Sequence, residues 1–95
     1  MPPSETSEEI LRISSSSSVQ STGSAIAHHC YDYRKVRLRA VGAGAVNQAM
    51  KAIVAARGFA ASRGMNLVCI PGMENVDGKG GEKISAMTFL VFDNT

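Results

Sequence analysis

The sequence predicts an α+β fold in which a four-stranded mixed sheet carries two helices on one face. Apolar and polar residues alternate strictly along Lys35–Val41, which is typical of a half-buried strand. Apolar residues recur at helical spacing on both sides of that strand, and two further strand-like runs follow after residue 64. The resulting order is βαβαββ. Because crossovers between parallel strands are right-handed, both helices are expected on the same face of the sheet.

The first half of the chain contains a strand, a helix and a second strand. Ile10–Ser14 is short, apolar and β-branched and is predicted as a strand. Ser14–Ser18 ends it and supplies hydroxyls that can cap the helix predicted over about Gln20–Tyr33. The strand Lys35–Val41 then points one set of side chains to the core (Val36, Leu38 and Ala40) and a basic set to the other face, which also carries Arg12 (Lys35, Arg37 and Arg39).

A glycine turn followed by an alanine-rich helix is predicted over Gly42–Phe59. Ala55 and Gly58 fall on its exposed side, where small residues would let another chain approach closely. Arg57 falls on the apolar side, so its side chain must snorkel, pair, or lie past the helix end. The predicted apolar face consists of Val46, Ala49, Met50, Ile53, Ala56 and Ala60.

The second half ends with two strands joined by a glycine-rich segment. Met65–Gly72 is a continuous apolar run, which favours a strand buried on both faces. Asn75–Glu82 is predicted as a flexible connection, and Lys83–Phe92 as the last strand.

The chain's 95 residues predict one domain, over residues 10–95, after a polar, acidic and disordered tail over residues 1–9. Composition is 44% hydrophobic but only 5% aromatic, and no apolar run reaches the ~18 residues that a membrane span needs. The N-terminus does not resemble a signal peptide. Two cysteines without a secretory signal favour reduced thiols and a cytoplasmic location.

Positive charge is concentrated in the middle of the chain. Net charge is only +2, yet residues 33–73 carry seven Lys or Arg and no acid, between two acidic flanks. This distribution suits an anionic partner such as nucleic acid, although clustering on an ordinary solvated surface would look the same.

The glycine turn is a poor match to a dinucleotide-binding fingerprint. Gly42 and Gly44 supply two of its glycines, Asn47 replaces the third, and no acid follows at the required distance. Two interpretations remain. The turn either connects a strand to a helix and does no more, or it presents helix N-terminal amides to a nucleic-acid phosphate.

No metal, cofactor or catalytic site is predicted. His28, His29 and Cys30 are consecutive, so a helix points them in different directions, and Cys69 alone adds no zinc-like spacing. Serines occur as a loop run without a nucleophile motif, and no acid–base pair lies within the basic middle.

The stretch VRLRAVGAGAVNQAMKAIVAARGFAASRGMNLVCIPG (residues 36–72) closely resembles the stage V sporulation protein S (SpoVS) family. The resemblance lies in the GAGA–NQA–KA, ARGF and CIP segments and extends over about residues 10–92. It implies a two-layer, Alba-like sandwich, and Alba proteins are dimers that bind nucleic acid. It also implies a small cytoplasmic regulator, linked to sporulation and development, without known catalysis.

The predicted phosphate contacts combine the residue patterns with this resemblance. Alba proteins usually carry basic residues in the first two strand–helix connections; this chain has serines and glycines there, with Ser16 where relatives are expected to have lysine. That departure lowers the expected affinity for duplex. One alternative is a structural protein that contacts a partner through the Gly42–Gly58 face, and another is a sensor of small anions. The candidate nucleic-acid-binding residues are Ser16, Ser17, Arg37, Arg39, Gly42, Gly44, Asn47, Gln48, Lys51, Lys79 and Lys83.

Overall fold

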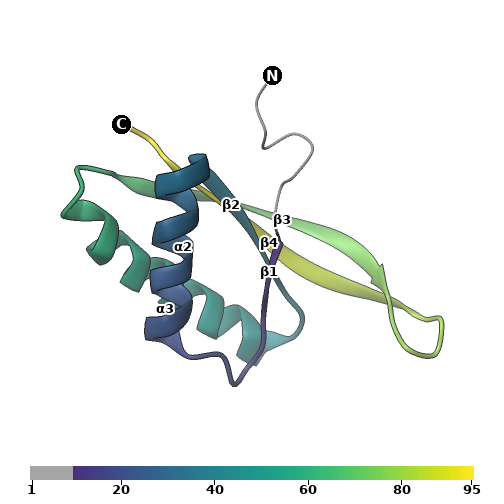
Figure 1. Ribbon diagram of the computed structural model, residues 1–95. Helices are drawn as coiled ribbons and strands as arrows, with labels where there is room; N and C mark the ends of the chain where they lie inside the picture. The colour runs from purple at the N-terminus through teal and green to yellow at the C-terminus, as the bar shows by residue number, and fades with distance from the viewer. Residues whose placement is uncertain (1–9) are drawn as a thin grey trace.

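The computed structural model describes residues 10–95, in which two helices pack on one face of a four-stranded sheet (Figure 1). This confirms the predicted α+β class and the βαβαββ order. The tail predicted over residues 1–9 lies outside the described residues. The elements are β1 (Ile10–Ile13), α2 (Val19–Tyr33), β2 (Lys35–Ala40), α3 (Ala43–Ala61), β3 (Leu67–Asp77) and β4 (Lys83–Asp93).

The sheet has the strand order β1-β2-β4-β3, with β1 and β2 parallel and the other pairs antiparallel. Leu38 lies opposite Leu11 on one side and Phe89 on the other, so these three side chains share the helix-covered face. By the same register, the opposite face, here called the open face, carries the basic residues of β2, as predicted. It consists of Ile10, Arg12, Lys35, Arg37, Arg39, Val68, Ile70, Gly72, Glu74, Val76, Ile84, Ala86, Thr88, Leu90 and Phe92.

Helix α3 packs against both the sheet and α2, which requires a wider buried surface than the single predicted stripe. A Cβ atom on Gly23 of α2 would lie 2.8 Å from the Cβ of Ala55, so the two helices are in close contact there. The prediction that Ala55 lies on the exposed side is therefore wrong. Met50, predicted on the apolar face, is 42% exposed. The buried residues of α3 are Ala45, Ala49, Ala52, Ile53, Ala56 and Ala60.

Arg57, which was predicted on the apolar side of the helix, forms a polar pair at the surface. Its side chain is exposed, and its Nη2 donates to Oδ1 of Asn66 at 3.0 Å. The guanidinium therefore stays in solvent beside the connection that follows α3.

Strand β3 lies at the edge of the sheet, so the prediction of burial on both faces is wrong. Ile70 is 55% exposed, and Pro71, which has no N–H to donate, is tolerated at an edge position. The strand also continues to Asp77, which shortens the predicted connection to residues 78–82. Within this turn, the N–H of Gly78 donates to the carbonyl of Glu82 at 2.7 Å. The β3–β4 hairpin extends beyond the helices (Figure 1).

Cys30 and Cys69 do not form a disulfide with each other. The Sγ of Cys30 lies at the helix–sheet interface and donates to the carbonyl of Val91 at 3.6 Å. Burial, reinforced by the negative charge of Asp93, raises the pKa of the Cys30 thiol to about 11.

Neither of the helices described in residues 10–95 is long and apolar enough to span a bilayer. Across the same residues, no three His, Cys, Asp or Glu side chains gather in a way that could hold a metal ion.

Candidate nucleic-acid interface

An open groove of about 710 Å³ lies where β1 and β2 end and α3 begins. The end of β3 closes its remaining side. The groove therefore brings together the first strand–helix loop, the glycine turn and the hairpin. Its lining residues are Arg12, Ile13, Ser14, Ser15, Arg39, Val41, Gly42, Gly44, Ala45, Val76 and Asp77.

The start of α3 is open toward this groove. Gly42, the N-cap residue, has φ 91°, a left-handed conformation that favours glycine, and it has no side chain to cap the helix. No other described side chain caps this end, and the first turn contains no acid. By contrast, Ser18 caps α2 by accepting from the N–H of Ser21 at 3.2 Å. The first amides of α3, with the positive end of its dipole, are thus available to an anion.

Gly44 lets the serine loop approach α3 closely. A Cβ atom at Gly44 would lie 2.9 Å from the Cβ of Ser15, closer than real side chains pack. One turn later, Nε2 of Gln48 donates to the carbonyl of Ser17 at 2.9 Å and fastens the loop to the helix. Oε1 of Gln48 accepts from Nδ2 of Asn47 at 3.3 Å. Gln48, predicted as a phosphate contact, therefore holds one wall of the groove.

The serines form a tight turn rather than an extended loop. The N–H of Ser17 donates to the carbonyl of Ser14 at 3.1 Å, and the N–H of Ser14 donates to Oγ of Ser17 at 2.9 Å. The hydroxyl of Ser16 lies 3.1 Å from that of Ser14. The predicted residues Ser16 and Ser17 thus lie beside the start of α3, on the turn that carries the lining residues Ser14 and Ser15.

Arg39 lies flat across the sheet and pairs with an acid. Its Nε donates to Oε1 of Glu74 at 2.6 Å, although β4 separates the two strands that carry them. The pair passes over Ala86 and Thr88, which are 0% and 6% exposed although they belong to the open face. The small side chains of β4 leave room for the bridge. Arg39 lines the groove, but part of its charge is balanced by Glu74.

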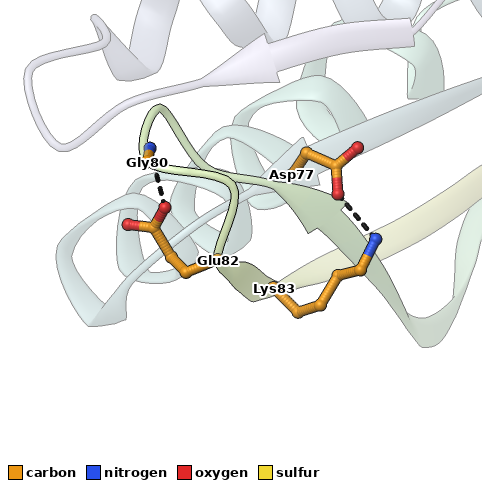
Figure 2. Close-up of polar contacts among 4 residues, drawn as sticks. All are labelled: Asp77, Gly80, Glu82 and Lys83. Carbon is orange, nitrogen blue, oxygen red and sulfur yellow. Dashed lines mark hydrogen bonds and ion pairs between the residues drawn. The ribbon is translucent and has the colours of Figure 1, made fainter.

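The hairpin carries balanced charge. Nζ of Lys83 lies 2.6 Å from Oδ1 of Asp77, and both side chains are 73% exposed (Figure 2). In the turn, the N–H of Gly80 donates to Oε1 of Glu82 at 2.8 Å (Figure 2). Lys79 is exposed at the tip. Two lysines and two carboxylates sit within these few residues, so the hairpin adds little net charge.

The predicted residues do not form one cluster. Gly42, Gly44 and Arg39 line the groove, and the serine turn borders it. Asn47 and Lys51 lie on the first turns of α3, where both are exposed. Lys79 and Lys83 belong to the hairpin, and Arg37 lies on the open face.

Sequence reasoning missed Arg12 and Asp77 as lining residues of the groove. The predicted arrangement, with both helices on one face of the sheet, placed Arg12 on the same face as Arg39, but nothing local indicates that β1 ends at the groove. Asp77 was assigned to the connection, since its strand was predicted to end earlier.

Comparison with known proteins supports both the fold and the family. The chain matches the structure of "Alba from Thermoplasma volcanium" with a TM-score of 0.58 and 12% identity, over 88% of this chain and 99% of that one. At this identity the match shows the fold alone, and it confirms the Alba-like architecture. The family model for Stage V sporulation protein S (SpoVS) matches residues 9–94. Because that match spans nearly the whole chain, the protein belongs to the SpoVS family.

Proposed function

We propose that the protein is a non-enzymatic regulator that binds the phosphate backbone of nucleic acid, as a homodimer, through the groove at the start of α3. The observation that carries this proposal is the uncapped N-terminus of α3 opening into a groove lined by Arg12 and Arg39. Backbone amides at a helix start bind phosphate without needing a side chain. This suits a chain with serines and glycines where basic residues were expected.

Cations supply the long-range attraction in this arrangement. Arg12 is exposed beside the groove, and Lys51 is exposed on the third turn of α3. Arg39 supports them from the end of β2 with a charge partly balanced by Glu74. The serine turn offers hydroxyls, and the hairpin with Lys79 and Lys83 would extend along the ligand. These contacts recognise backbone rather than bases, so binding of this kind has low sequence specificity.

Dimerisation is supported by apolar residues that the single chain leaves exposed beside α3. Met50 and Val54 are one helical turn apart on α3 and are 42% and 68% exposed. Met73, on the helix side of the edge strand β3, is 66% exposed. Apolar groups of this size favour contact with another chain. The same residues favour the second candidate function, a protein that assembles with itself or a partner through the Gly42–Gly58 face.

The test is fluorescence anisotropy with labelled duplex DNA, single-stranded DNA and RNA across a salt series. The double variant Arg12→Gln/Arg39→Gln removes two cations that line the groove. The control Arg57→Gln/Arg63→Gln removes two exposed cations at the other end of α3, roughly 20 Å away along the helix axis. Both variants have the same net charge, so a difference between them reports position rather than charge.

Loss of two phosphate contacts lowers the slope of log K against log salt by about 1.8 for duplex. When the salt concentration rises fourfold, the association constant of the parent is therefore expected to fall roughly tenfold further than that of the groove variant. Equal effects of the two variants would refute this location for the site. No binding at low salt by a folded parent protein would refute the function and favour the assembly role.

A further inference from the structure

The open face of the sheet carries an apolar patch that neither the fold nor the groove uses. Beyond the Arg39–Glu74 bridge, β4 presents Leu90 and Phe92 on this face, and the edge strand β3 presents Ile70 and Val68 beside them. Ile70 is 55% exposed and the other three are half-buried. An antiparallel sheet that faces water on one side normally alternates apolar with polar residues. Here both faces of β4 are apolar.

The neighbouring strand β2 adds positive charge to the patch. Lys35 lies opposite Phe92, and Arg37 lies opposite Leu90. Lys35, which is half-buried next to Phe92, is the cation at this end of the patch, beside two rows of apolar side chains. We call these six residues the open-face patch: Lys35, Arg37, Val68, Ile70, Leu90 and Phe92.

We propose that the open-face patch docks an acidic amphipathic α-helix of another protein. The apolar rows lie on adjacent strands about 4.8 Å apart, and successive residues in each row are separated by roughly 6.7 Å. A helix whose apolar residues recur every three or four positions presents a stripe of matching width. Its acidic flank would lie over Lys35. Charge complementarity thus fixes both the partner's chemistry and the side on which its acids lie.

Two other occupants fit the patch less well. Nucleic acid binds open sheets by stacking bases on aromatic rings, and Phe92 is the only aromatic residue in the patch. A second copy docking through the same face would bring another set of the same cations to this surface. The patch also lies beyond the Arg39–Glu74 bridge, away from the groove, so its partner does not compete directly with phosphate.

The first experiment titrates the ¹⁵N-labelled protein with a synthetic peptide of about 18 residues, five helical turns, with leucines on one face and glutamates along its flanks. A matched peptide replaces every glutamate with lysine. The acidic peptide is expected to shift amides of β2, β4 and β3 next to the patch, and the basic peptide is not. Equal binding of both peptides, or shifts confined to the helix layer, would overturn the proposal.

Variants then locate the contact. Ile70→Ser and Lys35→Glu are each expected to weaken binding of the acidic peptide at least fivefold, about 1 kcal/mol. The control Tyr31→Ser changes a similarly exposed aromatic residue of α2, in the helix layer, and is expected to leave binding within about twofold. Equal losses in all three would overturn the proposal.

Two measurements separate the alternative occupants. Ile70→Ser is expected to leave both the sedimentation-equilibrium mass and duplex affinity unchanged. A lower mass would assign the patch to a second copy, and a loss of duplex binding would assign it to nucleic acid. Either result would overturn the proposed helix partner. Because the peptide titration contains no nucleic acid, its failure is independent of the groove's function.

Discussion

Two glycines in the same helix predict opposite effects when each is replaced by alanine. Gly44 and Gly58 both belong to α3. A Cβ atom at Gly58 would meet nothing within 4 Å, whereas one at Gly44 would lie 2.9 Å from the Cβ of Ser15. If Gly44 serves to bring the serine loop against α3, Gly44→Ala destabilises the protein while Gly58→Ala stabilises it.

The expected sizes follow from the two environments. Alanine in place of an exposed helical glycine gains about 0.5–1 kcal/mol, which is the prediction for Gly58→Ala. At Gly44 the same preference is opposed by overpacking, which typically costs about 1–3 kcal/mol. The clash is with an atom next to the backbone, so the loop itself has to move and the bond from Gln48 to Ser17 weakens. Because the helix preference is the same at both sites, we expect the two variants to differ by about 1–3 kcal/mol, the cost of overpacking.

Urea denaturation followed by circular dichroism measures both values, with all samples at one protein concentration so that any dimerisation contributes equally. For a domain of this size, each 1 kcal/mol corresponds to a shift of about 4–8 °C in Tm, which gives an independent check. Equal stabilisation by both substitutions would refute the close-approach role of Gly44. The glycine at position 44 would then have to be explained by ligand binding alone.

Two further predictions concern charge. Asp77→Asn removes a carboxylate that lines the groove and pairs with Lys83, so duplex affinity should rise and the salt slope should steepen by about 0.9; unchanged anisotropy curves would place the hairpin away from phosphate. The Cys30 thiol titrates near 9.0 when unfolded and near 11 when folded, so its contribution to stability is complete below pH 9.0 and falls as pH rises from 9.0 to about 11. Cys30→Ala should lose this part of the pH dependence in urea titrations, and identical slopes would contradict it.

Local patterns predicted the elements because they report on one strand or helix at a time. The alternation in Lys35–Val41 gave β2 and the direction of its arginines, since a strand's two faces follow directly from its period. The apolar run that forms β3 was misassigned as buried on both faces because its composition does not reveal its place in the sheet. The order β1-β2-β4-β3 puts it at an edge, and that order depends on contacts between distant segments.

The candidate site was harder to predict because its charges are paired across long separations. Arg39 was expected to face phosphate, and the pattern placed it on the correct face. Its partner Glu74 is 35 residues away and reaches it over an intervening strand. Likewise, nothing near Gln48 in the sequence indicates that its side chain fastens a loop 31 residues earlier. Such contacts follow from the tertiary arrangement alone.

The glycines and the glutamine of the GAGA and NQA segments, which resemble the family, therefore act mainly by shaping the local structure. Gly42 supplies a left-handed turn, Gly44 admits the serine loop, and Gln48 fastens it, so these residues build the groove rather than charge it. The positive charge at the groove comes from outside these segments, and Arg12 is its clearest source. Substitutions in these segments should thus lower stability together with binding. Substitutions of cations and carboxylates around the groove should change binding and its salt dependence while the fold remains intact. This contrast distinguishes residues that build the groove from residues that bind the ligand.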